Sequence, residues 1–342
     1  MMNENLDLAI ACPVCGWNAS FAMSSEEDYH YGIFGRFELW CCNNCRHHFQ
    51  YPMPTECDLA SYYNRDYYSY QLPDIDMEPR GLRHRGVWLM AHYCRLYRGY
   101  RHLKVFPNPL LAFIGWLLVR KRRDLLTPRY IAEGTACDYG CGSCGRVPFL
   151  RYCGWQAEGI EFSEAAAAAG KSAGLTITHG SIGTLEDRPS TYDFIHSSHC
   201  VEHVPDVQRL FRAFYTAMKP GGTLAIEVPS ADSAALRIYG HAYYYLGLPV
   251  HVHLFSAESL KHIATQAGFT NITISPVSFL FSHAESWLLR RDLRGGKASP
   301  RLDSHGKWAT AYAKVASLGS FVQSIVGHRG DCLMLVANRP ST

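Results

Sequence analysis

Residues 135–147 read TACDYGCGSCGRV. The acidic residue of this stretch, Asp138, stands two places ahead of Gly140 and is followed by Gly142, and a second acid, Glu161, lies further on in the sequence EGIEFS. Glycine has no Cβ, so it lets a turn between a strand and a helix bring its backbone close to a ligand. A carboxylate at the end of the next strand can accept hydrogen bonds from both ribose hydroxyls. The pattern predicts a pocket for a nucleotide cofactor.

The glycine spacing alone leaves two kinds of cofactor open. Gly140, Gly142 and Gly145 also satisfy the GxGxxG pattern of dinucleotide enzymes. A pyrophosphate group in this turn would be repelled by the carboxylate of Asp138. S-adenosylmethionine (SAM) instead carries a cationic sulfonium and an amino group. The acid therefore favours SAM, with an NAD enzyme as the alternative.

Several further segments resemble those of the class I SAM-dependent methyltransferases. ACDYGCG is similar to their first motif, GIEFS to the ribose motif, YDFIHSSHCVEHV to the fourth strand with its active-site loop, and MKPGGTLAIEVP to the fifth strand. HVHLFSAESLKHIATQAGF resembles the next segment in the branch of quinone-biosynthesis O-methyltransferases and many glycan or natural-product methyltransferases. One departure from the family pattern is Cys144, which stands at the position of the third glycine. The next glycine, Gly145, comes one residue later.

The resemblance implies SAM as the methyl donor and also implies where SAM binds. The residues expected to bind it are Asp138, Gly140, Cys141, Gly142, Glu161, Phe162, Ser181, Ile182 and Ser198. Ser181 and Ile182 are expected near the adenine, and Ser198 and His199 near the methionine end.

Alternating strand and helix patterns predict an α/β fold with a doubly wound, mostly parallel, seven-stranded sheet. Strands are expected near residues 136–139, 157–160, 175–178, 194–196, 223–228, 270–275 and 331–337. A helix is expected from Val207 to Met218, stopping at Pro220 to Gly222. Another is expected over residues 258–267, with Ser256 as its N-cap and Gly268 as its stop. An insertion at 277–330 reads as helical and is expected to cover the acceptor site.

The N-terminal part contains two CxxC pairs, Cys12 with Cys15 and Cys42 with Cys45. This spacing is typical of a zinc ribbon, in which four thiolates complete a closed tetrahedral site. Because four protein ligands leave no open position, the zinc is expected to be structural. Cys41 would break the two-residue spacing and is expected to be a strand residue.

Three regions are therefore predicted: a zinc ribbon at 1–58, a helical and aromatic connecting region at 59–130, and a methyltransferase domain at 131–342. An N-terminal zinc module before a SAM domain is similar to the arrangement in sugar C-methyltransferases and certain ribosomal-RNA guanine methyltransferases. Tyrosines follow the ribbon at positions 62, 63, 67, 68 and 70. They are expected either to stack on a sugar or base or to pack the ribbon on the main domain.

An uninterrupted apolar run, LLAFIGWLLV, occupies residues 110–119 between basic flanks. It is too short to span a bilayer, which takes about 20 residues. Two interpretations remain open. The run is either a peripheral membrane contact, with its flanks on anionic headgroups, or a helix packed on the catalytic domain.

Composition excludes some classes of protein. The chain has 342 residues, 47% of them hydrophobic, so it can bury a large core. The net charge of +3 does not indicate a nucleic-acid partner, so a small-molecule or glycan-type acceptor is expected. The first residues, MMNENLDLAI, lack the pattern of a signal peptide. We therefore expect a cytoplasmic protein, whose 13 cysteines are thiols or metal ligands.

Catalytic candidates follow the fourth strand in the sequence SSHCVEHV. His199, Glu202 and His203 would lie at the carboxyl edge of the sheet, near the transferring methyl group. Quinone O-methyltransferases carry a similar ExxEH motif implicated in divalent-metal binding, and here His199 replaces its first carboxylate. Glu202 could instead sit favourably at the start of the next helix, so metal dependence stays open.

His251 and His253, in LPVHVHLFS, form a second candidate pair. On a strand they would point the same way. One of them could act as the general base that removes the acceptor hydroxyl proton. Equally, both could satisfy buried backbone carbonyls.

The sequence thus predicts a SAM-dependent methyltransferase acting on an oxygen, or a carbon, of a small or glycan-type acceptor. The alternatives are a nucleotide-sugar C-methyltransferase, a zinc-ribbon RNA methyltransferase, and a SAM-binding protein without catalysis. Methyl transfer itself needs little covalent help, because alignment supplies much of the rate.

Overall fold

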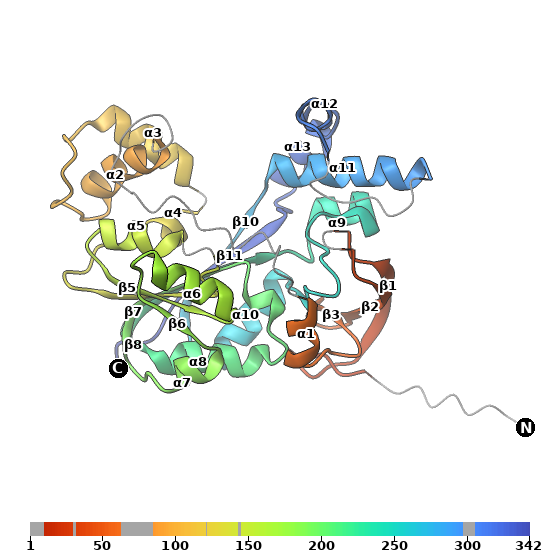
Figure 1. Ribbon diagram of the computed structural model, residues 1–342, viewed down its shortest axis with the longest axis horizontal. Helices are drawn as coiled ribbons and strands as arrows, with labels where there is room; N and C mark the ends of the chain where they lie inside the picture. Colours follow the sequence, from red (N-terminus) through yellow and green to blue (C-terminus); the bar gives the residue numbers. More distant parts are fainter. Residues whose placement is uncertain (1–9, 30–31, 63–84, 121, 143–144, 297–304) are drawn as a thin grey trace, which may run out of the picture.

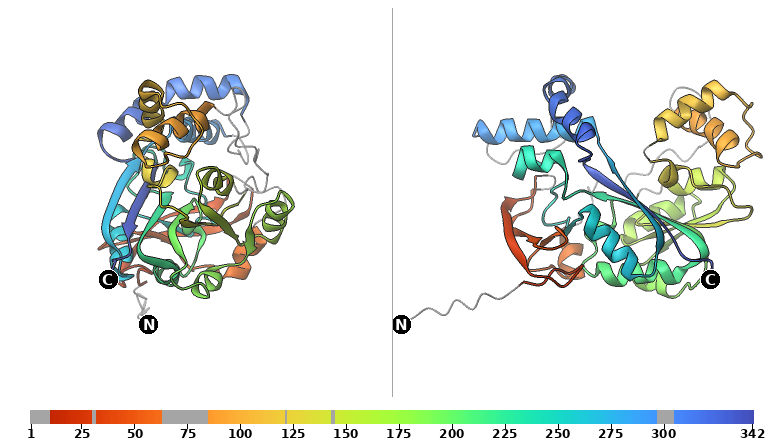
Figure 2. Two further views of the ribbon diagram at one scale, coloured as in Figure 1. Left: turned by 90° about the vertical axis from the view of Figure 1, so that its left-hand side faces the viewer. Right: turned by 180° about the vertical axis from the view of Figure 1, so that it is seen from behind.

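The computed structural model describes residues 10–29, 32–62, 85–120, 122–142, 145–296 and 305–342. Its centre is a seven-stranded sheet with helices on both faces (Figures 1 and 2). In spatial order the strands are β10 (Thr270–Val277), β11 (Cys332–Asn338), β8 (Met218–Pro229), β7 (Tyr192–Ser198), β4 (Thr135–Tyr139), β5 (Gln156–Glu161) and β6 (Ile177–His179). The five strands from β8 to β6 run parallel, whereas β11 is antiparallel to both of its neighbours. The predicted doubly wound, mostly parallel sheet is confirmed.

The alternation of side chains along β4 shows why this sheet is covered on both faces. Cys137 and Tyr139 pack into the core that contains α8 (Val207–Ala217). Ala136, the residue before Cys137, packs into the other core, with residues of α5 (Arg146–Tyr152). Successive residues of a strand point to opposite faces, so a strand buried on both sides reads as one apolar run.

Helix boundaries follow local capping chemistry. Ser256 is the N-cap of α10 (Ala257–Gln266), as predicted, and it forms the reciprocal bonds of a capping box with Ser259. Gly268, at φ +101°, follows the end of this helix. The predicted end of the helix at Pro220 was wrong: α8 ends at Ala217, and Met218 already pairs with β7. The other helices on the sheet are α6 (Glu164–Ser172) and α7 (Ile182–Glu186).

A smaller antiparallel sheet carries the cysteine pairs, in the order β1 (Ala19–Glu27), β2 (Phe34–Cys42), β3 (His48–Gln50) and β9 (His253–Leu254). Cys41 lies in β2, as predicted. β9 comes from the methyltransferase part of the chain, and Phe49 of β3 belongs to the same apolar core as the sheet. The ribbon is therefore joined to the main domain by both hydrogen bonds and packing.

The described part of the connecting region contains four helices, α1 (Glu56–Tyr62), α2 (Arg85–Tyr97), α3 (Pro109–Val119) and α4 (Arg123–Leu126). Asn108 caps α3 through the amide of Leu111, and Pro109 stands at the first helical position. Gly115 packs against α2, since a Cβ there would lie 2.1 Å from the carbonyl oxygen of Leu89. Of the five tyrosines after the ribbon, only Tyr62 lies within the described residues.

The last part of the chain contains α9 (Ala234–Tyr239), then α11 (Leu280–Arg294), α12 (Lys307–Ala316) and α13 (Leu318–Val326). Short 3-10 turns, η3 (Val201–His203) and η4 (Gly240–Ala242), complete the described elements. Helices α11 to α13 lie within the predicted helical insertion at 277–330, of which residues 297–304 lie outside the described residues. Within the described ranges, no helix is long and apolar enough to cross a membrane.

Candidate functional site

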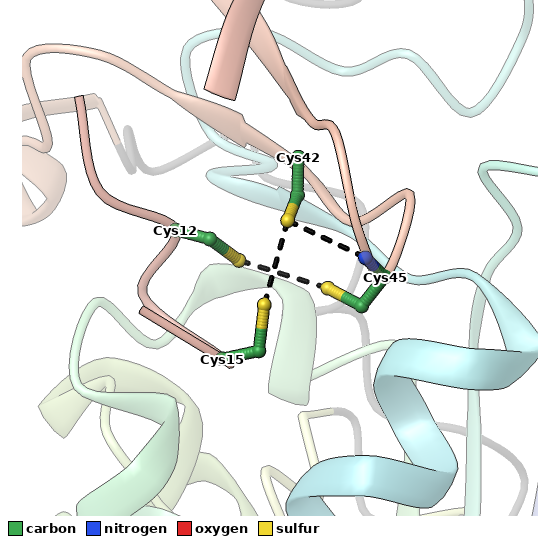
Figure 3. A group of neighbouring side chains, drawn as sticks. All are labelled: Cys12, Cys15, Cys42 and Cys45. Atoms are coloured by element: carbon green, nitrogen blue, oxygen red, sulfur yellow. Dashed lines mark hydrogen bonds between the residues drawn. The ribbon is translucent and has the colours of Figure 1, made fainter. Parts of the chain in front are cut away.

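Four thiols meet at one point between the two knuckles of the ribbon (Figure 3). The sulfur atoms of Cys12 and Cys45 are 3.7 Å apart, and those of Cys15 and Cys42 are 3.4 Å apart. All four sulfurs lie within 4.8 Å of one another. A tetrahedral zinc ion with bonds of about 2.3 Å needs sulfur atoms about 3.8 Å apart. The cysteine cluster therefore fits a zinc ion, which stays a prediction.

Local geometry prepares these thiols for a cation. Gly16 follows the first knuckle at φ +75°, a conformation that a residue with a Cβ rarely adopts. The backbone amides of Val14 and Cys45 donate to the sulfurs of Cys12 and Cys42. A hydrogen bond from Cys45 lowers the pKa of Cys12 to about 5, and the same bond raises the pKa of Cys45. One thiolate is thus already favoured in this pair.

A pair of buried histidines links the ribbon to the catalytic loop. The neutral ring of His253, whose pKa burial lowers to about 4, donates from Nε2 to the carbonyl oxygen of Val204 at 3.1 Å. Its Nδ1 therefore accepts from Nε2 of His47 at 3.0 Å. Both ring nitrogens of His253 are engaged inside the protein, and only His253 of the predicted histidine pair lies in a strand. This geometry gives His253 a structural role.

The predicted cofactor residues gather at the carboxyl ends of neighbouring parallel strands, where such sheets bind ligands. Asp138 stands near the end of β4, Glu161 ends β5 and Ser198 ends β7. Ser181 and Ile182 follow β6 at the start of α7, with Ile182 buried. Sequence positions far apart are thereby brought to one edge.

Glu161 is held in place by backbone amides. Its carboxylate accepts from the amide of Gly142 at 2.7 Å and from that of Ser163 at 2.8 Å. Burial raises the pKa of this carboxyl, although the amides oppose that shift. Two oxygens have more acceptor sites than two amides use, so the oriented group can still accept from ribose hydroxyls. Phe162, next to it, is half exposed and could cover a flat ring.

The glycine turn itself differs from the expectation. Gly140 has φ +68°, but the space at its α-carbon is taken by Cys200, whose sulfur would lie 2.1 Å from an added Cβ. Cys141 likewise packs against Gly159. These glycines are thus required by protein packing as well as by any ligand. Ser143 and Cys144 lie outside the described residues.

Asp138 is buried and has a partner that the sequence did not suggest. Its Oδ1 lies 2.6 Å from Nδ1 of His196 on β7. Asp138 and Glu161 together put two carboxylates beside the predicted pocket. They complement the cationic sulfonium and amino group of SAM, so the residues present fit this cofactor.

A buried cluster of charged side chains lies beside the same edge. Glu227, fully buried near the end of β8, accepts two hydrogen bonds from Arg122, at 2.5 and 2.6 Å. His199 lies between two carboxylates, 3.4 Å from Glu227 and 3.3 Å from Glu202. Arg122 comes from the connecting region and stacks over Phe279. The connecting helices are therefore tied directly to the site.

The ring of His199 is charged in this setting. Burial alone would lower its pKa, but Cys332 and the carboxylates of Glu202 and Glu227 raise it well above its ordinary value. Burial raises the pKa of the Cys332 thiol to about 12, so this thiol is uncharged at neutral pH. The negative charges that raise the pKa of His199 there are those of the two carboxylates. The ring also stacks on Tyr245, with centroids 5.3 Å apart.

Glu202 does not start the next α-helix, as one interpretation had it. It lies in η3, five residues before α8 begins at Val207, and it is fully buried. Among the described residues, neither of its carboxylate oxygens makes a well-aligned hydrogen bond. Its positively charged neighbour His199 lowers its pKa to about 2, against the effect of burial. The charged ring of His199 therefore supplies the counter-charge for this buried carboxylate.

Two further histidines converge on Glu202. Ligand atoms of Glu202, His203 and His251 lie within 4.8 Å of one another, so the three could hold a metal ion. The Nδ1 atoms of His203 and His251 bond the carbonyl oxygens of Val250 and Tyr245, both at 2.9 Å. Such bonds hold each ring in a fixed orientation, as they do in metal-binding histidines.

Sequence reasoning missed four residues of this cluster: Arg122, His196, Glu227 and Tyr245. One signal was available, because Glu227 stands inside the apolar run LAIEVP, and a charge in a buried strand needs a partner. Nothing in the sequence indicated that the partner was Arg122.

Comparisons with known proteins agree with this architecture. Residues 116–274 match the profile of the Methyltransferase domain family Methyltransf_23. Over 103 residues the chain is 27% identical to Phosphoethanolamine N-methyltransferase 2 of Caenorhabditis elegans, covering 28% of this chain and 21% of that protein. Over 205 residues it is 23% identical to Demethylmenaquinone methyltransferase of Anoxybacillus flavithermus, covering 50% of this chain and 84% of that protein.

Solved structures with a similar fold include a SAM-dependent methyltransferase from Archaeoglobus fulgidus. The TM-score is 0.44 at 20% identity, covering 65% of this chain and 93% of that one. A methyltransferase in complex with the Trm112 activator of Haloferax volcanii gives a TM-score of 0.45 at 14% identity, covering 73% of this chain and 97% of that one. Scores of this size support no closer relationship. The family match and the strand order lead to one conclusion: the chain contains a class I SAM-dependent methyltransferase domain.

Proposed function

We propose that this protein transfers the methyl group of SAM to an oxygen of a small-molecule or glycan-type acceptor. The single observation that carries the proposal is the charged cluster beside the cofactor edge, in which His199 lies between Glu202 and Glu227. A site that only bound SAM would have no need to bury two carboxylates and an arginine there, because burying charge is costly.

The roles of the histidines follow from their hydrogen bonds. His199 is charged, so it serves to orient the carboxylates and not to accept a proton. The rings of His203 and His251 are oriented by bonds from Nδ1 to backbone carbonyl oxygens, and imidazole is the side chain that most often acts as a general base. Burial lowers the pKa of His203, which keeps its ring neutral at physiological pH. We therefore assign proton removal from the acceptor hydroxyl to one of these two rings.

A divalent cation is an alternative use of the same residues, because an imidazole whose lone pair binds a metal cannot also accept a proton. One carboxylate with two imidazoles suits manganese, iron or zinc better than magnesium. Bound to Glu202, His203 and His251, such an ion would lower the pKa of an acceptor hydroxyl. The protein residues would still position the acceptor.

Transfer to carbon stays as the second candidate. Its support is the similarity to a demethylmenaquinone methyltransferase over half of this chain. A carbon acceptor would need the same base, here to remove a carbon-bound proton after methyl transfer.

Binding is tested first, by calorimetric titration with S-adenosylhomocysteine. Wild type and Glu161→Gln are compared, with Glu164→Gln as the matched control, since Glu164 is an exposed acid in the first turn of α6. Loss of charge-assisted bonds of about 1.5 to 3 kcal/mol should weaken binding by roughly 10- to 150-fold in Glu161→Gln. The control should bind like the wild type.

Transfer is then measured with radiolabelled SAM and four probes: a catechol, 1,4-dihydroxynaphthalene, phosphoethanolamine and total RNA. Label in the catechol that is lost in His203→Asn or His251→Asn, with S-adenosylhomocysteine binding retained, supports O-methylation. Label in the naphthalene diol carbon selects the second candidate. Label only in RNA or phosphoethanolamine would contradict the proposed acceptor, and no binding to the wild type would overturn the cofactor assignment.

A further inference from the structure

The helix pair α12 and α13 exposes an unusual amount of apolar surface. On α12, Trp308 is 90% exposed and Val315 is 74% exposed, with Tyr312 exposed between them. Their spacing of four and three residues places them on one helix face. On α13 the exposed apolar residues repeat that spacing: Leu318, Val322, Ile325 and Val326. The other side of α12 is anchored, because Ala313 packs with residues of α11.

Helix α3 shows the same two-sided character. Ala112 and Val119 are buried, and Gly115 contacts the backbone of α2. Leu110, Phe113 and Leu117, at positions i, i+3 and i+7, are exposed, and Leu110 is 67% exposed. Phe106, just before the helix, is 83% exposed. The apolar run at 110–119 is therefore a packed helix on one face and an open apolar stripe on the other.

The chain segments that carry both stripes have charges of a single sign. Residues 86–123 and 305–330 contain no aspartate or glutamate. Exposed basic residues border the stripes: Arg101, Lys104 and Arg120 near α3, and Lys307, Lys314 and Arg329 near α12 and α13. Apolar and aromatic side chains ringed by basic ones are typical of elements that lie in the interface of an anionic membrane.

The two elements lie at the same end of the molecule. α3 and the α12–α13 pair are both at the top in Figure 1 and in both views of Figure 2. They are separate in sequence and do not cover each other, so a partner that meets both must be broad. A lipid surface has that shape, and Trp and Tyr prefer its headgroup region.

We propose that α3 and the α12–α13 pair form one peripheral membrane-binding surface, selective for anionic lipid. Apolar side chains of the stripes enter the headgroup region while the lysines and arginines meet lipid phosphates. This inference goes beyond the methyltransferase reaction, because it concerns where the protein resides and needs no acceptor.

The test is co-sedimentation of the full chain with vesicles, without SAM or acceptor. Vesicles of phosphatidylcholine with about a third phosphatidylglycerol are compared with pure phosphatidylcholine. Wild type should bind the anionic vesicles and be released by salt, since the ionic part is screened. The variant Trp308→Ala/Val315→Ala/Val326→Ala should partition at least about tenfold more weakly. Phe106→Ala/Leu110→Ala should weaken partitioning independently.

The matched control is Trp17→Ala/Phe34→Ala, which removes exposed apolar side chains from the ribbon and should bind vesicles like the wild type. All variants change exposed residues, and unchanged S-adenosylhomocysteine binding will show that each is folded. Wild type that stays in the supernatant with anionic vesicles overturns the proposal. So does a triple variant that binds like the wild type, or a wild-type dimer that the triple variant converts to a monomer, which would assign the surface to a second copy of the chain.

Discussion

Replacing Arg122 by methionine is expected to lower the free energy of unfolding by about 2 to 3 kcal/mol at neutral pH. Methionine keeps much of the side-chain volume and removes the charge. Glu227, fully buried, then loses hydrogen bonds of 2.5 and 2.6 Å. His199 still faces it at 3.4 Å. The substitution therefore tests how much the Arg122–Glu227 ion pair contributes to holding the connecting helices on the sheet.

The magnitude comes from the exposure of the two partners. Removing one partner of a fully buried pair costs about 3 to 5 kcal/mol. The side chain of Arg122 is 28% exposed, so water screens part of the interaction, and His199 compensates part of the remaining charge. Both effects place the expected value below that range.

The sign of the pH dependence is also fixed. Burial alone would raise the pKa of Glu227, but His199 and Arg122 outweigh it and hold the pKa below its ordinary value. The stabilisation is therefore present above the unfolded pKa of about 4.3, and it is lost as pH falls through the folded pKa. The cost of Arg122→Met should shrink in acid.

Urea denaturation followed by tryptophan fluorescence at neutral and acidic pH measures this difference. Arg120→Met, at an exposed position two residues earlier, is the control and should stay within about 0.5 kcal/mol of the wild type. The double variant Arg122→Met/Glu227→Gln completes a cycle that gives the coupling. A cost for Arg122→Met no larger than the control, or one that grows in acid, would refute the reasoning.

Three further predictions concern packing and metal. Cys45→Ser should abolish stoichiometric zinc in elemental analysis and destabilise the fold, whereas Cys41→Ser, outside the cluster, should keep both; zinc retained by Cys45→Ser would contradict the four-thiolate site. Gly140→Ala should lower the free energy of unfolding by about 2 to 4 kcal/mol, because the added Cβ would lie 2.1 Å from the sulfur of Cys200 and φ is +68°. An unchanged free energy of unfolding would contradict the argument that Cys200 fills this space. Gly115→Ala should destabilise α2 and α3 in hydrogen exchange, because its Cβ would lie 2.1 Å from a backbone oxygen; Gly183→Ala, with open space around it, should be neutral, and equal effects would contradict the argument.

Much of the candidate site was accessible from sequence because parallel strands end at one edge. Asp138, Glu161 and Ser198 each lie at or near the end of a strand, and strand order brings these ends together. The cysteine spacing predicted the cluster for a similar reason, since each CxxC is a local knuckle. Local sequence left alternatives open where a side chain's partner lies far away in the chain. His253 was a candidate base or a ligand of a buried carbonyl, and the structure pairs it with Val204 and with His47 of the ribbon.

The sequence by itself determined the class of the fold, the seven strands and the four thiols, because periodicity, capping and knuckle spacing are local properties. Only the tertiary structure decided that Arg122 neutralises Glu227 and that His251 joins Glu202 and His203. It also decided that the space beside Gly140 belongs to Cys200. These are contacts between residues distant in sequence, and burial makes them obligatory. A buried charge needs a partner of opposite charge, and space in the interior must be filled by another side chain, but local sequence does not say which residue does either.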